Sequence, residues 1–191
     1  MLTAGIDEAG RGPLAGPVVA AAVIFPKGKK IPEAITDSKK LSEAKREELY
    51  EIIIREFIYG VGIVSEKEID KINILQASFL AMRRAIRGVK IAPDYIILDG
   101  KFKIPKLDKP QTAIISGDAK VFCVAAASII AKVSRDYLMD EFAKKYPQYD
   151  FAKHKGYGTK LHFSKINEHG PCPIHRFSFA PIKEMVIKKS T

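Results

Sequence analysis

The sequence predicts an α/β protein with a mixed central β-sheet flanked by helices and a helical C-terminal portion. Short β-branched runs alternate along the chain with longer segments of helical periodicity, which is the pattern of a sheet covered by helices. The chain has 191 residues, of which 47% are hydrophobic, so it can bury a sizeable core. Because no linker composition interrupts it, we expect one domain over residues 1–191.

The first elements follow from short apolar runs and the residues that punctuate them. Residues 2–6 predict a strand that stops at an acidic pair, and residues 9–13 predict a loop because they contain glycines and a proline. Residues 17–25 are β-branched and bounded by proline, so they predict a buried strand. A basic loop follows over 27–40, and Ser42 can cap a helix that runs to about residue 55.

The middle of the chain repeats the alternation of strand and helix. Residues 57–64 predict a third strand, and residues 66–87 a helix in one or two pieces. Residues 95–98 and 112–115 predict two further short strands, which end in Asp-Gly and Ser-Gly-Asp sequences. We therefore expect five strands in all.

A long helix is expected over residues 121–145, and a shorter one near 160–168. The apolar stripe of the long helix comprises Phe122, Ala126, Ile129, Val133 and Tyr137. The opposite side carries Ser128, Lys132 and Arg135. The part from about 145 to 191 mixes glycine, proline, histidine and basic residues, so we expect it to pack as a helical C-terminal portion.

The charge balance favours a polyanionic partner. Lys plus Arg number 32 and Asp plus Glu 22, which gives a formal charge of +10. Such a surplus favours nucleic acid first and an anionic membrane surface second. No apolar run reaches the roughly 18 residues needed to cross a bilayer, and the N-terminus does not resemble a signal peptide. Two cysteines form no disulfide framework, so we expect a cytoplasmic protein.

Acidic residues stand where three of the expected strands end: Asp7 and Glu8, then Asp99, then Asp118. Carboxylates at the ends of buried strands cost free energy unless a cation meets them. Strand ends in one sheet can converge, and sites made of oxygen ligands favour Mg²⁺ or Mn²⁺. Acids beside glycines also suit ordinary turns, so the residues alone leave both the metal site and the turn open.

Two acids side by side on a strand present a geometric difficulty. Successive residues of a regular strand face opposite sides, so Asp7 and Glu8 would not both face one site. The glycines downstream, Gly10 and Gly12, would let the chain twist there. Two other acids have simpler interpretations: Asp136 suits an ion pair or a cap, and Asp37 suits local hydrogen bonding in its loop.

Two weaker motifs lack the context that their sites require. The segment 10–15 matches the dinucleotide-binding pattern G-x-G-x-x-A, but the next segment predicts a strand where that motif requires a helix. Cys172 and His175 could begin a zinc site, but no second ligand pair has the standard spacing. The further zinc ligands would be His154, His162 or His169.

Basic and aromatic residues in two loops favour contacts with nucleic acid. Ser38 and Lys39 lie in the basic loop, where lysines can contact phosphate. Tyr157 lies between two glycines in the basic segment 154–160, so it can stack on a base or sugar. A tyrosine that packs beneath its own loop is the alternative, and the residues leave the two open.

The chain resembles bacterial ribonuclease HII, the type 2 ribonuclease H, in five segments that follow one another in the same order as in that family. The first of them is long and specific, and together they extend over essentially the whole chain. They are Asp7–Val18, Asp37–Leu41, Gly117–Lys120 followed by Ala125–Asp136, His154–Thr159 and Pro173–Arg176; Phe122 and Cys123, which precede the alanine run, depart from the family pattern.

The resemblance implies an RNase H-like fold and a metal-dependent endonuclease. Such an enzyme hydrolyses the RNA strand of RNA–DNA hybrids and nicks duplex DNA at single ribonucleotides, leaving 5′-phosphate and 3′-hydroxyl ends. It uses two divalent cations, Mg²⁺ or Mn²⁺. The implied metal ligands and catalytic residues are Asp7, Glu8, Asp99 and Asp118. The implied substrate-binding residues are Gly10, Arg11 and Gly12, which recognise the 2′-hydroxyl, Tyr157, which stacks beside the sugar, and Ser38 and Lys39.

Two alternatives to this function are distinguishable. A ribonuclease HIII-like enzyme would carry an additional N-terminal domain, and only six residues precede Asp7 here. A non-catalytic basic nucleic-acid-binding module would explain the charge of +10 but not four acids that repel phosphate. We further expect a monomer, because no heptad pattern is evident, and we expect residues from about 145 to 191 to contribute to substrate binding.

Overall fold

The computed structural model describes residues 1–26, 28–29, 32, 35 and 41–189. Five strands form one mixed sheet in the order β3-β2-β1-β4-β5. The β1–β2 and β2–β3 pairs are antiparallel, and the β1–β4 and β4–β5 pairs are parallel. The strands are β1 Thr3–Ala9, β2 Val18–Ile24, β3 Ile58–Val64, β4 Tyr95–Asp99 and β5 Gln111–Ile114.

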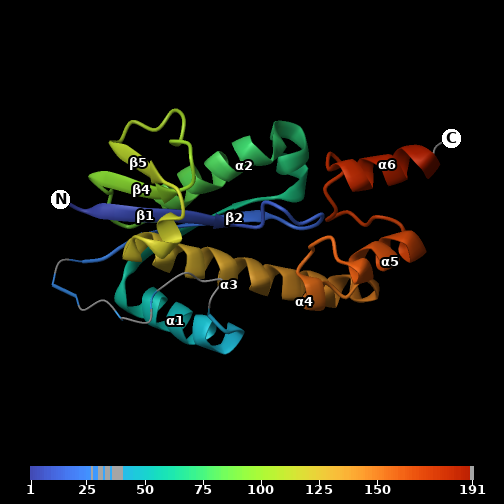
Figure 1. The fold of residues 1–191 in the computed structure, drawn as a ribbon, viewed down its shortest axis with the longest axis horizontal. Coiled ribbons are helices and arrows are strands. Elements are labelled where there is room, and N and C mark those ends of the chain that lie inside the picture. The colour runs from blue at the N-terminus through green and yellow to red at the C-terminus, as the bar shows by residue number, and fades with distance from the viewer. Residues whose placement is uncertain (27, 30–31, 33–34, 36–40, 190–191) are drawn as a thin grey trace.

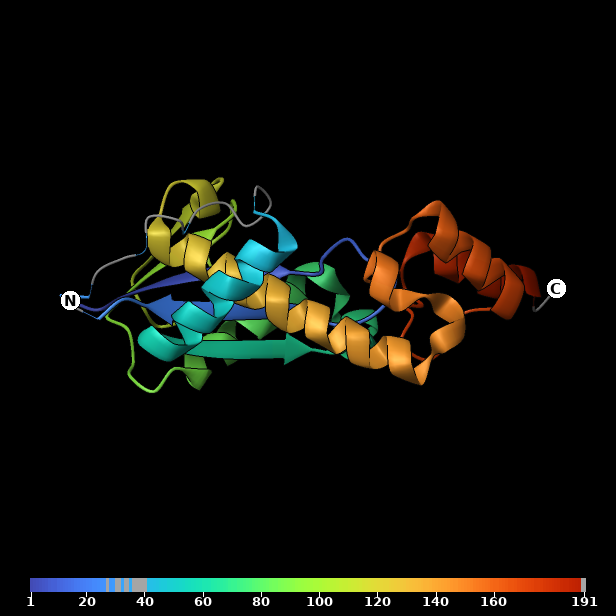
Figure 2. The ribbon, with the colours of Figure 1, turned by 90° about the horizontal axis from the view of Figure 1, so that it is seen from below.

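Helices cover both faces of this sheet, which confirms the predicted fold class (Figure 1). One face packs on α2, and the other packs on α3, which α1 covers in turn (Figures 1 and 2). The helices are α1 Glu43–Glu56, α2 Glu66–Gly88, α3 Phe122–Lys145, α4 Phe151–His154, α5 Lys160–His169 and α6 Ala180–Lys189, with 3-10 turns η2 Gly117–Ala119 and η3 Pro147–Tyr149.

The local signals in the sequence explain where the helices begin and bend. The Ser42 side chain accepts a hydrogen bond from the Lys45 amide, so it caps α1 as expected. Helix α2 is broken into two pieces at Asn73, whose φ of 63° is not helical. The side chain of Asn73 accepts hydrogen bonds from the amides of Leu75 and Gln76 and so begins the second piece.

Helix α3 lies directly on β1 because Gly5 has no side chain. A Cβ atom at Gly5 would overlap the backbone of Cys123 in the first turn of α3. This close approach leads the helix along the strand, so that Ser128 comes to lie beside Asp7. The position of α3 therefore follows from one glycine in the strand beneath it.

The apolar stripe that we predicted for α3 is wrong in part. Phe122 and Tyr137 are 52% and 43% exposed, whereas Ser128 and Arg135 are buried. The helix is packed between the sheet, α1 and the C-terminal portion, so most of its circumference is covered. Periodicity finds one covered face and misses a helix that is enclosed on several sides.

The C-terminal portion lies at the end of the molecule opposite the N-terminus, as Figure 2 shows. Helix α5 was predicted; α4 and α6 were not. Backbone hydrogen bonds join this portion to the loop between β1 and β2: the amides of Leu14 and Gly16 donate to the carbonyls of Gly156 and Ile174. None of the helices in the described ranges has the length and apolar character of a membrane span.

Candidate active site

Three of the predicted acids come together where β1 and β4 end. The last residue pair between β1 and β4 is Ile6 with Leu98, so Asp7 and Glu8 follow the paired part of β1 on that side, while both still pair with β2. Asp99, the last residue of β4, faces the same opening. These three carboxylates line a cavity of about 310 Å³. Asp7 and Glu8 thus line one cavity although they are adjacent on a strand, which answers the geometric difficulty in the sequence.

Asp7 is a buried carboxyl group surrounded by like charges. Its residue is 6% exposed. Burial raises the pKa of Asp7 well above its ordinary value, and the charges of Glu8 and Asp99 raise it further. A hydrogen bond from Ser128 on α3 opposes this rise. Without a cation, ionisation of Asp7 in this cluster is therefore costly.

Glu8 is left with an unsatisfied oxygen. Its Oε1 accepts a hydrogen bond from Nη1 of Arg11 at 3.1 Å, whereas its Oε2 is buried with no partner among the described residues. Burial raises the pKa of Glu8, and the Arg11 guanidinium partly offsets that rise. A buried carboxylate oxygen without a partner costs free energy that a bound cation would recover.

Asp99 and Asp118 meet at a neighbouring cavity. Oδ1 of Asp99 accepts a hydrogen bond from the Gly117 amide at 2.7 Å, which attaches the end of β4 to η2. Asp118 lies in η2 and not at the end of a strand, and it is 4% exposed. Together with Asp99 and Arg11 it lines a second cavity, of about 440 Å³. Asp99 thus borders both cavities, and Asp118 borders the second.

The carboxylates fit a divalent cation by their chemistry. No three His, Cys, Asp or Glu side chains within the described ranges are already arranged as a metal site. The donors around the first cavity are nevertheless carboxylate oxygens, which hard cations such as Mg²⁺ and Mn²⁺ prefer. The unpartnered Oε2 of Glu8 is an available ligand.

A glycine-rich turn and a tyrosine complete the first cavity. Gly10, Arg11 and Gly12 line it between β1 and β2. Gly10 has a φ of 94°, and a Cβ atom there would overlap the side chain of Arg135. Tyr157, 44% exposed, lines the cavity from the C-terminal portion.

These observations agree with the comparisons with known proteins. Residues 4–182 match the family model for ribonuclease HII. A ribonuclease HII of Endomicrobium trichonymphae is 57% identical over 184 residues, which is 96% of this chain and 87% of that protein. The chain belongs to the ribonuclease HII family. It is therefore a metal-dependent endoribonuclease of the type 2 ribonuclease H class, which acts on RNA–DNA hybrids.

Solved structures agree with this family and its fold. The ribonuclease H2 of Pyrococcus horikoshii superposes with a TM-score of 0.82 at 28% identity, covering all of both chains. Bst-RNase HIII in complex with Mn²⁺ superposes with a TM-score of 0.73 at 17% identity, covering 98% of this chain and 70% of that one. The second likeness concerns the fold alone, so a ribonuclease HIII-like enzyme is not favoured.

Several cavity residues of this ribonuclease HII were not predicted as site residues: Arg46 on α1, and Ser128 and Lys132 on α3. Ser128 and Lys132 are four residues apart, so they occupy one face of the helix, and that spacing was a usable signal. Arg46 gave no such signal, because its place depends on how α1 packs against α3.

The other motifs have structural outcomes. The glycine motif of residues 10–15 leads into strand β2, so it does not open a helix as a dinucleotide site would. Asp136 is paired with Lys132, whose Nζ donates to Oδ1 at 2.6 Å. Ser38, Lys39 and Asp37 lie outside the described residues, so their roles stay predictions.

The candidate zinc residues bond to one another and to the backbone. The Tyr157 carbonyl can only accept, so His162 donates to it from Nδ1 at 2.9 Å and must accept at Nε2. His175 then donates from its own Nε2 at 3.1 Å and accepts the Cys172 amide at Nδ1. Burial lowers the pKa values of His162 and His175 to about 4 each and raises that of the Cys172 thiol to about 11. This neutral chain supports the backbone of Tyr157.

Proposed function

We propose that this ribonuclease HII hydrolyses the RNA strand of RNA–DNA hybrids and also nicks duplex DNA at single ribonucleotides, leaving 5′-phosphate and 3′-hydroxyl ends. The observation that carries the proposal is the buried, unpartnered Oε2 of Glu8 beside Asp7, in a cavity that a glycine turn also lines. Two buried acids without a cation are costly to fold, and their cost is repaid when a divalent cation and a phosphate enter.

In this proposal two divalent cations, Mg²⁺ or Mn²⁺, are held by four carboxylates: Asp7, Glu8, Asp99 and Asp118. Asp7 is assigned as the shared ligand, because the charges of both Glu8 and Asp99 act on it. Bound cations would supply Lewis-acid stabilisation of the charge that develops on the phosphate and the leaving oxygen. Asp118 would serve from the second cavity, which it shares with Asp99.

The remaining cavity residues would bind and orient the substrate. The glycine turn brings its backbone close to whatever enters the cavity, with the amides of Arg11 and Gly12 free of partners among the described residues, which suits recognition of a 2′-hydroxyl. Tyr157 is exposed enough to stack beside the sugar. Lys132 and Arg46 add positive charge for the phosphates.

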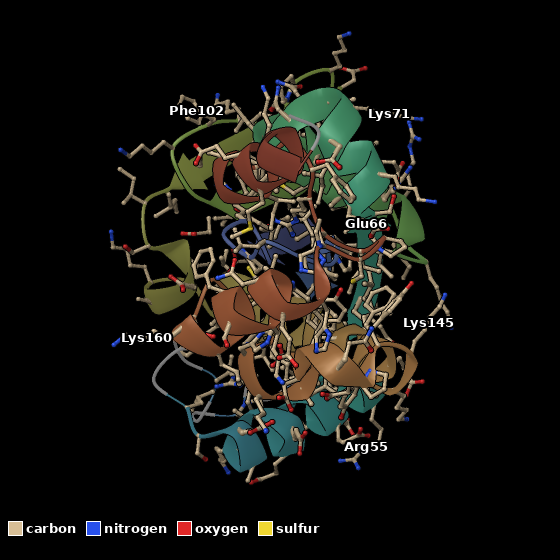
Figure 3. The ribbon with its side chains drawn as sticks, turned by 90° about the vertical axis from the view of Figure 1, so that its right-hand side faces the viewer. Arg55, Glu66, Lys71, Phe102, Lys145 and Lys160 are labelled. Atoms are coloured by element: carbon tan, nitrogen blue, oxygen red, sulfur yellow. The ribbon has the colours of Figure 1, made fainter. Side chains whose placement is uncertain are left out.

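The basic periphery would supply affinity independent of sequence. Arg55, Lys71, Lys145 and Lys160 extend outward from the ribbon around the molecule, as Figure 3 shows. Ser38 and Lys39 would add to these contacts. Because Tyr157 belongs to the C-terminal portion, residues from about 145 to 191 would contribute to substrate binding within one domain of residues 1–191. Action as a monomer and a cytoplasmic location stay predictions, the latter supported by two unpaired, buried cysteines.

The test is cleavage of a DNA duplex that contains one ribonucleotide, with an all-DNA duplex of the same sequence as the reference. We expect a nick at the ribonucleotide with Mg²⁺ or Mn²⁺ and none in EDTA. Glu8→Gln should abolish the nick, whereas Glu141→Gln, at an exposed position on α3, should not. Binding without any nick would instead support a non-catalytic module and overturn the proposal.

A further inference from the structure

Two arginines lie wholly inside the molecule beneath the glycine turn. Arg135 comes from the middle of α3 and Arg176 from the segment that precedes α6, and both are 0% exposed. Neither forms an ion pair with a carboxylate in the part of the chain that the structure describes. Burial, together with the nearby charge of Arg135, lowers the pKa of Arg176 to about 9. Two like charges buried together are costly, so their position requires an explanation.

Both guanidinium groups bond to backbone carbonyls of the segment 10–17. Arg176 donates to Gly10 from Nη2 at 2.6 Å and to Arg11 from Nη1 at 3.0 Å. Its further bonds reach the carbonyls of Gly16 and Pro17. Arg135 donates to the carbonyls of Pro17 and Ala15. The carbonyls of this segment are therefore turned inward, toward two buried cations.

The inward carbonyls fix where the amides of the turn point. In a trans peptide the C=O and the following N–H point in opposite directions. Because the carbonyls of Gly10 and Arg11 point to Arg176, the amides of Arg11 and Gly12 point away from it, and both residues line the first cavity. Neither amide donates a hydrogen bond to another described residue. Two unsatisfied donors are thus presented to whatever enters.

Arg135 also contacts the tyrosine on the other side of the cavity. Its guanidinium carbon lies 5.7 Å from the centre of the Tyr157 ring, a distance typical of a cation–π contact. A Cβ atom at Gly10 would overlap the Arg135 side chain, so the arginine touches both the turn and the ring. Its Nη1 is buried without a hydrogen-bond partner. The two arginines therefore connect residues that are far apart in the sequence.

We propose that Arg135 and Arg176 are positioning residues for ribonucleotide selection. They hold the carbonyls of Gly10 and Arg11 inward, so that the amides of Arg11 and Gly12 face the oxygen of a 2′-hydroxyl, and Arg135 fixes Tyr157 beside them. Arginine is required because its planar fork donates to several carbonyls at once, which the ammonium of lysine does not reproduce. The inference rests on the proposed function and deepens it.

The test compares two substrates that differ in the group at one sugar. One duplex carries a single ribonucleotide and the other a single 2′-fluoro nucleotide, because fluorine is a poor hydrogen-bond acceptor. Single-turnover rates are measured for the natural sequence, Arg135→Lys and Arg176→Lys at a temperature where thermal melting shows each protein folded. We expect the ratio of the two rates to fall by about tenfold in each variant, through loss of cleavage at the ribonucleotide.

A control and a variant on the other side of the contact keep the test decisive. Tyr149→Phe removes a buried hydrogen bond to the Gly170 carbonyl in the C-terminal portion without touching the turn, so it should leave the ratio unchanged. Gly10→Ala displaces the turn from Arg135 and should lower the ratio even if an arginine variant fails to fold. An unchanged ratio in the folded variants would overturn the inference. Failure of the natural sequence to cleave the ribonucleotide would instead overturn the proposed function.

Discussion

The acid cavity and the pair of buried arginines lie on either side of the same turn, and they differ in how far their buried charged groups have hydrogen-bond partners. In the acid cavity, Asp7 is surrounded by like charges and Glu8 retains an unpartnered oxygen. Beneath the turn, Arg135 and Arg176 are buried more completely, yet nearly all their nitrogens donate to backbone carbonyls. The acid cavity therefore lacks partners for its charged groups within the protein, whereas the two arginines find nearly all of theirs there.

This difference distinguishes a ligand-binding region, the acid cavity, from a region that only stabilises the backbone, the two buried arginines. An unsatisfied buried acid lowers the free energy of unfolding until a cation binds. Such an acid therefore reduces stability in exchange for cation binding. A buried arginine bonded to carbonyls fixes the backbone and needs nothing from outside. Substitution of Asp7 or Glu8 should therefore keep or raise stability without metal, whereas substitution of either arginine should lower it.

The largest expected effect on activity is that of Asp7→Asn. Removing the shared carboxylate should lower the single-turnover rate on the order of a thousandfold or more, since metal stabilisation is worth several kcal/mol. Binding of the duplex should survive, because the basic surface is unchanged. The melting temperature without metal should stay equal or rise, because burial and two like charges no longer oppose the group. Near-normal turnover, or a marked loss of stability, would contradict the assignment of Asp7 to the metal-binding acid cavity. The matched control is Asp108→Asn, at an exposed loop position.

Tyr157→Ala should have the next largest effect. A ring that stacks on a sugar or base is worth roughly 1–3 kcal/mol, so the rate should fall by about ten- to a hundredfold. The loss should be greater with one ribonucleotide than with a hybrid, where neighbouring sugars also carry 2′-hydroxyls. Tyr157→Phe keeps the ring and should cleave at close to the natural rate. A lower melting temperature with unchanged kinetics would show that the ring only packs beneath its loop.

The order of strands and helices was predictable because local patterns determine it. Alternating apolar runs located all five strands, and Ser42 was correctly predicted as a helix cap. Helices α4 and α6 were missed, since neither has a long periodic pattern, and α3 was misjudged because several layers enclose it. Local sequence therefore determines where strands and helices form better than it determines how much of each helix is buried.

The candidate site was predictable where it depends on strand ends and unpredictable where it depends on packing. Asp7, Glu8 and Asp99 were located because acids after apolar strands are unusual, and they line one cavity. Arg46 was missed because another helix brings it there. The role of Arg176 was missed because its carbonyl partners lie about 160 residues earlier in the chain. No local pattern contains such a contact.

The histidine chain predicts a loss of stability in acid. His162 and His175 have pKa values of about 4 in the folded protein, below the ordinary value of 6.5. Between these values the unfolded chain binds more protons than the folded protein does. The contribution of the two histidines to the free energy of unfolding is therefore largest above about pH 6.5 and decreases as the pH falls toward 4. At pH 5 the loss should be on the order of 1–2 kcal/mol for each histidine.

Melting temperatures at pH 7 and pH 5 measure this effect. His175→Asn should be less stable at pH 7 but should show a smaller drop on acidification, because one titrating group is gone. His169→Gln, outside the chain of three bonds from Cys172 to Tyr157, should keep the full drop. An equal drop in all three proteins would show that the buried histidines are not its source.

The smallest expected effect on activity is that of Asp136→Asn, which tests where the acid cavity ends. Asp136 accepts a hydrogen bond from Lys132 at 2.6 Å and lines neither cavity that holds the other acids. Breaking this partly buried pair should cost about 1 kcal/mol and lower the melting temperature by about 2–4 °C. The rate of the folded enzyme should change by less than about threefold, since Lys132 keeps its charge in the first cavity. Asp118→Asn is the matched comparison, and it should lower the rate far more at little cost in stability. If the two variants lost equal activity with the fold intact, the fourth metal ligand would be Asp136, and the acid cavity would extend along α3.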